Sequence, residues 1–217
     1  MTATEVITLA KAGELSQLSP AIKNDSDVLV GYINLGLIEL YKRFPLRTDE
    51  AIITLMDGKT IYKLDGTDTD VSMGDPYMYL IGAYEDGTDN DYTASALSLP
   101  INEEDNIYSI NTISYNSVQI PLVTTGAYIS LIYVPKPTKV TTNTLDIEVD
   151  LPEQMIEPLL HYMGYRAHGA MDGNIQTESN THYMRFEASC NKLRELGVGI
   201  TPDDVEMRSR LSMKGFV

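Results

Sequence analysis

The chain has 217 residues, of which 43% are hydrophobic and 22% charged, an ordinary balance for a soluble globular protein. No apolar run approaches the ~20 residues that a membrane span needs, and a single cysteine, Cys190, excludes an internal disulfide. The formal net charge of −15 disfavours a protein that grips the phosphate backbone of DNA or RNA, and its usual meaning is a well-solvated surface.

The N-terminal part of the chain predicts two helices. Apolar residues recur at helical spacing over Ala3–Leu18, which predicts a first, short helix. Asn24–Asp27 supplies capping residues for a second helix over Val28–Phe44, and Pro45 stops it. Gly36 lies in the middle of the apolar stripe of this helix, where glycine costs about 1 kcal/mol relative to alanine. We therefore expect Gly36 to allow a neighbouring helix to approach closely.

From Leu46 onward the hydrophobic period changes to two, which predicts strands. Asp57-Gly58 accepts the left-handed backbone angles of a tight turn, so we expect it to join two strands as a hairpin. Asn116-Ser117 predicts a second turn of this kind. The expected strands are Ala51–Met56, Lys59–Leu64, Tyr77–Tyr84, Ile107–Tyr115, Ser117–Val123 and Tyr128–Val134.

Most of the negative charge lies in this β region. Between Thr48 and Asp105, fourteen acidic residues stand against two lysines, for a net charge of −12. The loop that begins at Asp65 brings several carboxylates together, as calcium sites do. The helix-loop-helix calcium pattern requires Gly at the sixth position and Glu at the twelfth, where this loop has Asp70 and Pro76. We therefore expect flexible acidic loops rather than a calcium site.

The stretch from Leu151 to Gly197 predicts a pair of antiparallel helices. Both halves carry apolar residues at steps of three and four, and Asp172-Gly173-Asn174 separates them as a short turn. Pro158 does not suit a helix interior, so a loose helical turn over Glu153–Ile156 should precede the regular helix. Gly197 ends the pair, and the remaining residues show no sustained period.

These elements predict an α+β fold in which a four-helix bundle from the two ends of the chain carries an inserted antiparallel β domain. Neither helical pair can bury its apolar stripe alone, and packing all four helices together is the simplest solution. The expected domains are residues 1–45 with 151–197 for the bundle, 46–150 for the β domain and 198–217 for a C-terminal docking tail.

The sequence contains no phosphate loop, dinucleotide-binding glycine pattern or nucleophile elbow. His161 and His168 are seven residues apart on one predicted helix, and His182 and Cys190 lie on the next. Facing helices can build a zinc site from such residues, but the spacing lacks the pattern of a zinc protease. Cys190 continues an apolar stripe and is expected to be a small buried hydrophobe. We therefore predict no catalytic residues, no cofactor, no metal site and no enzymatic activity.

In the order of its elements, the chain resembles the head-to-tail adaptor proteins of short-tailed bacteriophages, also called tail tubular protein A. The resemblance covers most of the chain, and short landmarks carry it: Val28–Asn34, Phe44-Pro45, Ile129–Tyr133 followed by Pro135-Lys136-Pro137, Leu151-Pro152-Glu153, Leu159–Tyr162, Tyr165–Ala167 and Asn180–Phe186. The acidic insert at Asp65–Asp105 matches no motif of that family.

The resemblance implies a structural virion protein, assembled in the host cytoplasm into a ring that is dodecameric in similar proteins. Its partners would be other copies of itself, the portal protein and the tail nozzle protein. Genomic DNA would pass through the ring without specific binding, and no membrane would be involved. An excess of acidic residues suits a channel of this kind, because repulsion between carboxylates and DNA phosphates favours loose contact over binding.

Two further expectations concern the surface. The tail after Gly197 places apolar anchors among basic residues, so we expect it to dock on a partner; the residues concerned are Met207, Arg208, Arg210, Leu211 and Phe216. The alternative function is a small-ligand or carbohydrate-binding module, with tyrosines and acidic loops forming the site. A third possibility is an enzyme that uses His161, His168 and Cys190, which metal analysis of the purified protein would test.

Overall fold

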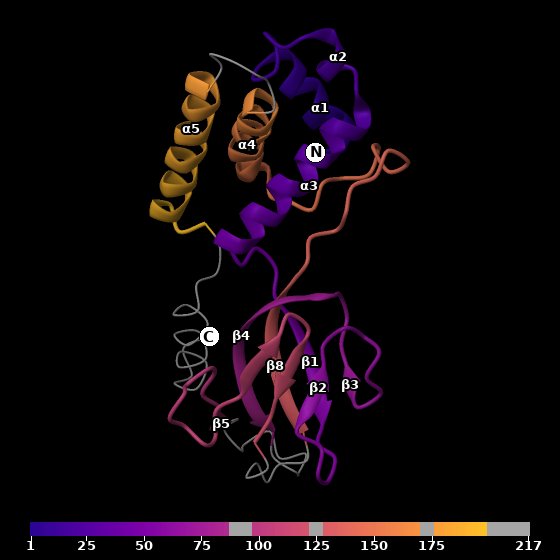
Figure 1. The fold of residues 1–217 in the computed structure, drawn as a ribbon, viewed down its shortest axis with the longest axis vertical. Helices are drawn as coiled ribbons and strands as arrows, with labels where there is room; N and C mark the ends of the chain where they lie inside the picture. The colour runs from indigo at the N-terminus through magenta and orange to yellow at the C-terminus, as the bar shows by residue number, and fades with distance from the viewer. Residues whose placement is uncertain (87–96, 122–127, 170–175, 199–217) are drawn as a thin grey trace, which may run out of the picture. The chain divides into compact units, whose positions relative to one another are not determined.

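The computed structural model describes residues 1–86, 97–121, 128–169 and 176–198 (Figure 1). The chain divides into two compact units, each with its own hydrophobic core. The helical unit contains the described residues of 1–46 and 137–200, and the β unit contains those of 47–136. None of the described helices is both long and apolar enough to cross a membrane.

The helices of the helical unit begin and end where local sequence signals place them. Thr2 and Glu5 form a capping box at the start of α1, and the Asp25 side chain accepts a hydrogen bond from the backbone N–H of Val28 in α3. A 3-10 turn leads into α4, as expected from Pro158. The elements are α1 (Ala3–Ala12), α2 (Pro20–Lys23), α3 (Ser26–Arg43), η1 (Glu153–Met155), α4 (Ile156–Gly169) and α5 (Gln176–Glu195).

The predicted antiparallel pair is confirmed as α4 and α5, which lie side by side in Figure 1. The Tyr162 ring on α4 meets Phe186 on α5 at a centroid distance of 5.3 Å, and Tyr165 meets Tyr183 at 5.1 Å. As numbers rise along α4 they fall along α5, which is the antiparallel order. The turn expected at Asp172-Gly173-Asn174 lies outside the described residues.

The predicted four-helix bundle is wrong. The described helices at the two ends of the chain do not form four aligned helices of similar length: α1 has 10 residues, α2 has 4 and α3 has 18. In Figure 1, α3 runs obliquely to the α4–α5 pair. The close approach is at Gly36, where an added Cβ would lie 2.4 Å from Leu159 Cδ1 on α4. That proximity confirms the expected use of Gly36, at an oblique helix crossing.

The segment between β8 and η1, from Pro137 onward, also packs against the helical core. The bundle prediction had assigned this packing to helices alone. Residues Val140 and Val149 of this segment are buried with the helices. The Asn34 amide on α3 donates to the Val140 carbonyl at 2.8 Å and accepts from its N–H at 2.9 Å. The N–H of Val149 donates to the Met1 carbonyl at 2.9 Å. These non-local bonds satisfy backbone groups that have no helical partner, and helical periodicity in the sequence cannot reveal them.

Two antiparallel sheets make up the β unit. A five-stranded sheet has the order β3-β1-β8-β4-β5, and a three-stranded sheet has the order β2-β7-β6. Their inner faces bury side chains such as Ile53, Tyr62, Val118 and Leu131 in one cluster. The strands are β1 (Asp49–Thr54), β2 (Ile61–Lys63), β3 (Val71–Ser72), β4 (Tyr77–Asp86), β5 (Leu97–Ser98), β6 (Asn111–Ser114), β7 (Ser117–Gln119) and β8 (Tyr128–Pro135).

The hairpin predicted at Asp57-Gly58 is wrong, although the turn itself forms, with Gly58 at φ +73°. The strands on its two sides belong to different sheets: β1 pairs with β3 and β8, while β2 pairs with β7. The hydroxyl of buried Tyr62 accepts from the Met56 N–H at 3.0 Å and donates to the Lys59 carbonyl at 3.2 Å. Backbone groups that a hairpin would pair are therefore satisfied by a side chain. The second predicted turn does join paired strands, β6 and β7.

Candidate functional site

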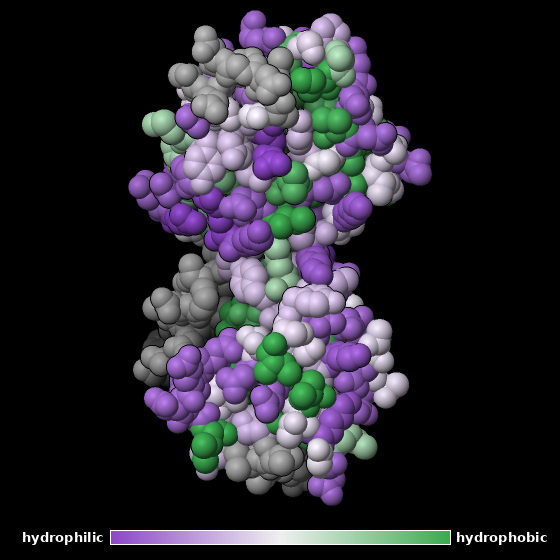
Figure 2. Space-filling view, viewed as in Figure 1, coloured by the Kyte–Doolittle hydropathy of each residue, from purple (hydrophilic) through white to green (hydrophobic). Residues whose placement is uncertain are grey.

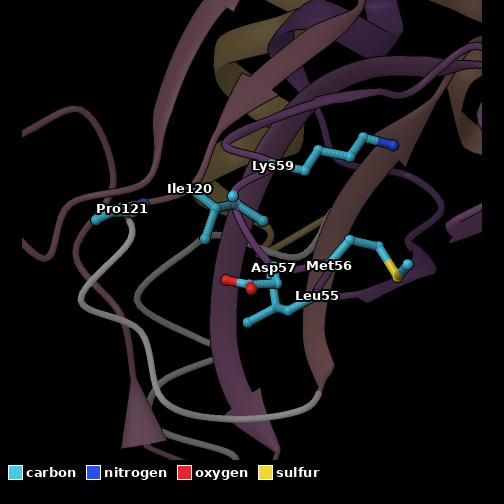
Figure 3. A pocket seen from close by; sticks show the side chains of 7 residues that line it. Leu55, Met56, Asp57, Lys59, Ile120 and Pro121 are labelled. Carbon is cyan, nitrogen blue, oxygen red and sulfur yellow. The ribbon is translucent and has the colours of Figure 1, made fainter.

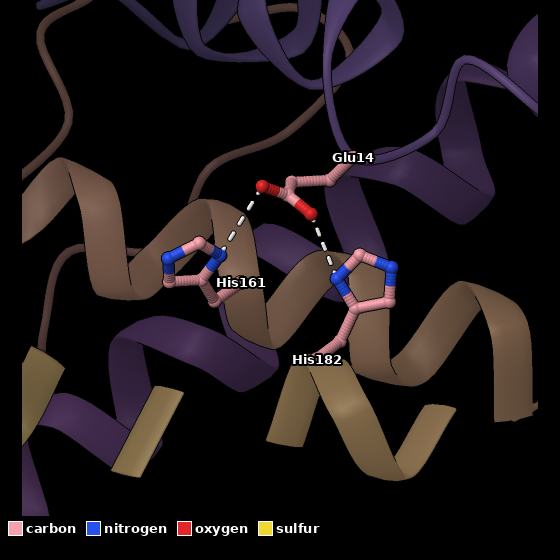
Figure 4. Close-up of side chains that lie close together, drawn as sticks. All are labelled: Glu14, His161 and His182. Atoms are coloured by element: carbon pink, nitrogen blue, oxygen red, sulfur yellow. Dashed lines mark ion pairs between the residues drawn. The ribbon is translucent and has the colours of Figure 1, made fainter. Parts of the chain in front are cut away.

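The helical unit brings three ionisable side chains from three separate segments together (Figure 4). Glu14 lies in the turn after α1, His161 lies on α4 and His182 on α5. The Nδ1 atom of His161 is 3.2 Å from Glu14 Oε1, and the Nδ1 atom of His182 is 2.7 Å from Glu14 Oε2. One atom from each of the three side chains lies within 4.8 Å of the other two. We call this group the His–Glu cluster.

Local structure explains why the cluster forms. Gly13 ends α1 with its N–H bonded to the Leu9 carbonyl at 2.9 Å, and the fully buried Leu15 anchors the turn. Glu14 is thereby held between two anchored neighbours. On α4, Gly164 lies three residues after His161, on the same face of the helix. A Cβ at Gly164 would be 2.8 Å from Nδ1 and 3.0 Å from Cγ of His182, so the missing side chain leaves room for that imidazole.

A second histidine pair extends the cluster. The His168 ring stacks on His182 with centroids 4.8 Å apart, and its Nε2 lies 3.1 Å from the Glu14 carbonyl oxygen. Its Nδ1 lies 3.2 Å from Glu178 Oε2. A cavity of about 370 Å³ borders these groups and is lined by Gly13, Glu14, Ser16, Gln17, His168, Glu178, Thr181, His182 and Arg185.

Burial is the largest influence on the protonation of His182 and lowers its pKa below the ordinary histidine value. The Glu14 carboxylate acts in the opposite direction, and His168, Arg185 and His161 lower the pKa further. Burial thus favours the neutral form of the His182 imidazole. A neutral imidazole has a free nitrogen lone pair, which can accept a hydrogen bond or bind a metal ion.

The comparison with known families decides the identity. The family model described as SU10 adaptor protein matches residues 1–210. The chain belongs to the SU10 adaptor protein family. A comparison with curated proteins gave no match. The family match agrees with the expected phage head-to-tail adaptor, and it indicates a structural component of the virion.

Sequence reasoning found only part of the cluster in this adaptor. It singled out four residues, of which the structure brings His161 and His182 together and places His168 beside them. It missed Glu14, because a glutamate after a helix-stopping glycine carries no signal of its own, and only the tertiary fold places it. Cys190 is buried in the helical core, as expected, and burial raises the pKa of its thiol to about 11.

The acidic loop of the adaptor uses its carboxylates internally. Lys59 Nζ lies 2.7 Å from Asp68 Oδ1 and 2.7 Å from Asp70 Oδ2. Asp68 Oδ2 accepts from the Lys63 N–H at 3.1 Å, and Asp65 accepts from the Thr67 N–H at 3.0 Å. Lys59 thus pairs with two carboxylates of the acidic loop, Asp68 and Asp70.

A small hollow of about 150 Å³ lies beside this loop, lined by Leu55, Met56, Asp57, Gly58, Lys59, Ile120 and Pro121 (Figure 3). Its one basic group, Lys59, is already paired with two aspartates. The tyrosines proposed for a carbohydrate site are partly committed elsewhere: Tyr62, Tyr77 and Tyr133 are buried in the β core. The predicted docking residues Met207, Arg208, Arg210, Leu211 and Phe216 lie outside the described part of the chain.

Proposed function

We propose that this adaptor forms an oligomeric ring, dodecameric as in the proteins it resembles, between the portal and the tail nozzle of a phage particle. The ring surrounds the path by which the genome leaves the head. The observation that carries the proposal is the family match over residues 1–210, which covers both units and reaches into the tail. A structural role for the whole chain follows more naturally from such a match than a role for one grafted domain.

Exposed apolar side chains on both units support ring assembly. Figure 2 shows apolar groups among polar ones on the surface of each unit. In the helical unit, Leu35 and Ile38 of α3 are 40% and 38% exposed; in the β unit, Ile61 and Ile113 are 49% and 47% exposed. A closed ring needs heterologous contacts, in which two different faces of each subunit meet. Apolar groups on separate units give the chain two such candidate faces.

The charge of the chain supports a channel through which DNA moves freely. With a net charge of −15, of which −12 lies between Thr48 and Asp105, the protein repels a phosphate backbone. A ring that bound DNA tightly would hinder ejection. The excess of acidic residues therefore suits passage of the genome without specific binding.

The docking tail would make the contact with the portal. Residues 198–217 carry apolar anchors, among them Met207, Leu211 and Phe216, interspersed with the basic residues Arg208, Arg210 and Lys214. A segment of this composition gains little by folding alone and can order against a partner surface.

Electron microscopy of the purified chain, alone and mixed with the portal protein of the same phage, tests the proposal. We expect rings, either of the chain alone or stacked on the portal. A chain that stays monomeric in the presence of an intact portal, with no added density on the portal, would contradict it.

Deleting Asp203–Val217 is the matched variant, and it should abolish assembly on the portal while leaving the melting temperature nearly unchanged. Normal assembly of the truncated chain would show that the tail is dispensable.

A further inference from the structure

We propose that Glu14, His161 and His182 form a binding site for one divalent transition-metal ion of the zinc class. The site goes beyond the adaptor role, which requires no metal. It also revises the expectation of no metal site, which rested on histidine spacing along the sequence and did not include Glu14.

The donor set fits such an ion. Zinc is bound in proteins by imidazole nitrogens and carboxylate oxygens, and three protein ligands with one open position form a familiar arrangement. Here one donor atom from each of the three side chains lies within 4.8 Å of the other two. The ligands come from the α1–α2 turn, from α4 and from α5. A bound ion would therefore connect three segments that are far apart in the sequence.

The ring nitrogens in the cluster point to a missing ligand. The Nδ1 atoms of His161, His168 and His182 are buried and have no hydrogen-bond partner, although those of His161 and His182 lie only 3.2 and 2.7 Å from Glu14 carboxylate oxygens. His182 is only 8% exposed. Buried polar atoms are normally satisfied, and those that are not call for an explanation. An ion held by the carboxylate and the two rings would satisfy two of these three nitrogens at once, after a small movement of the Glu14 side chain that widens its 2.7 Å contact with His182.

Neighbouring groups hold the proposed ligands in place. His182 fits against the bare backbone of Gly164 on one side and stacks on His168 at 4.8 Å between centroids. His161 turns its other nitrogen, Nε2, toward Glu157 Oε1 at 3.8 Å. A carboxylate behind a metal-bound imidazole is a common arrangement, because it orients the ring and makes it a better ligand.

The surroundings allow an ion to enter. The cavity of about 370 Å³ is lined by both Glu14 and His182. It has room for a water molecule as a fourth ligand and supplies polar groups, such as Thr181, along its wall.

The rival description is a metal-free ion pair, in which one protonated imidazole is shared with the Glu14 carboxylate. The two descriptions differ in what purified protein does when zinc is added. Only the metal site predicts saturable binding of one ion and a rise in melting temperature on addition of stoichiometric Zn²⁺.

The test uses the full chain without a histidine tag, stripped of metal with a chelator. Zn²⁺ is titrated by calorimetry, and Co²⁺ is used as a spectroscopic probe. We expect one equivalent of Zn²⁺ to bind and to raise the melting temperature by several degrees. The chain has three histidines, so the long-range ¹H–¹⁵N spectrum of the imidazoles can assign the ligands. The resonances of His161 and His182 should shift as a metal-bound nitrogen requires.

Glu14→Gln is the main variant, since it removes the carboxylate with almost no change of shape. We expect it to weaken Zn²⁺ affinity at least tenfold. Glu153→Gln is the matched control, because Glu153 is an exposed glutamate on η1 outside the His–Glu cluster, and the Zn²⁺ affinity of this variant should stay within a few-fold of wild type. Circular dichroism checks that both variants are folded. Absence of Zn²⁺ and Co²⁺ binding by the wild-type chain overturns the proposal. So does binding that Glu14→Gln leaves unchanged, or binding that shifts neither His161 nor His182.

Discussion

The Arg43 side chain joins α3 to α5 through several partners. Its Nη1 and Nη2 atoms each lie 2.8 Å from a carboxylate oxygen of Glu187 on α5, and its Nε lies 2.9 Å from Glu39 on its own helix. The guanidinium also covers the Phe186 ring at 4.7 Å. A bidentate arginine–carboxylate ion pair is stronger than a typical surface ion pair, because both hydrogen bonds are charge-assisted and their geometry is fixed.

Glu187→Gln should therefore lower the free energy of unfolding by about 1 kcal/mol at pH 7, a value already reduced for solvent screening. The hydrogen bonds from Arg43 hold the pKa of Glu187 below its ordinary value. A carboxyl with a lowered folded-state pKa stabilises the protein above its unfolded pKa, and this contribution is lost as the pH falls through the folded pKa. Urea titrations at pH 7 and pH 3 should show the difference between wild type and variant shrinking at the lower pH.

The control is Glu39→Gln, which removes a single i,i+4 contact with Arg43 and should cost about 0.3–0.5 kcal/mol. Equal losses for the two variants would contradict this account.

The crossing of α3 and α4 is a close helix contact in the helical unit, and Gly36 lies at it. Leu159, the side chain that meets Gly36, is fully buried and cannot swing into solvent. Gly31 lies five residues earlier on the same helix, and a Cβ there would meet nothing within 4 Å. Both glycines lie on α3, but only an added Cβ at Gly36 would meet a neighbouring side chain.

Gly36→Ala and Gly31→Ala should therefore change stability in opposite directions. An alanine at position 31 gains up to about 1 kcal/mol of helix propensity at no steric cost. At position 36 the new methyl group would lie 2.4 Å from Leu159 Cδ1 and 3.3 Å from Tyr162 Cδ1. We expect a net loss of about 1–3 kcal/mol there, since overpacking forces side chains and helices to shift. Thermal unfolding of the two variants beside wild type measures both effects. A Gly36→Ala variant as stable as Gly31→Ala would mean that the crossing can relax.

The elements also show where sequence reasoning succeeds and where it fails. The helix expected over Val28–Phe44 is observed as Ser26–Arg43, because its stripe and its caps are local signals. The bundle and the Asp57-Gly58 hairpin failed for the same reason. Both depend on which distant segment pairs with a given backbone group, as Asn34 does with Val140 and as β7 does with β2. Such partners are chosen by tertiary packing, which a periodicity does not encode.

The adaptor role and the candidate metal site of this chain differ in how far the sequence alone predicts them. The adaptor family was accessible from short landmarks along the chain, and the family match over residues 1–210 confirms it. Only part of the His–Glu cluster could be predicted from the sequence. Two histidines on facing helices could be anticipated, whereas Glu14 joins them from a turn more than a hundred residues away. The net charge, by contrast, is a property of the whole chain and needs no fold to interpret.

That charge leads to a prediction about nucleic acid. The purified chain should not shift linear duplex DNA in a gel at physiological salt, because a net charge of −15 repels the phosphate backbone at every distance that salt does not screen. Micromolar binding that weakens as salt is added would contradict the prediction, and the slope of log affinity against log salt would give the number of phosphates contacted. Replacing Arg208, Arg210 and Lys214 with glutamine would then distinguish two sources of binding. Loss of the gel shift in that variant would assign the contact to the tail, and a persistent shift would require a basic surface on one of the two units. If neither protein binds, repulsion by the acidic β unit is sufficient to keep the genome mobile within the proposed ring.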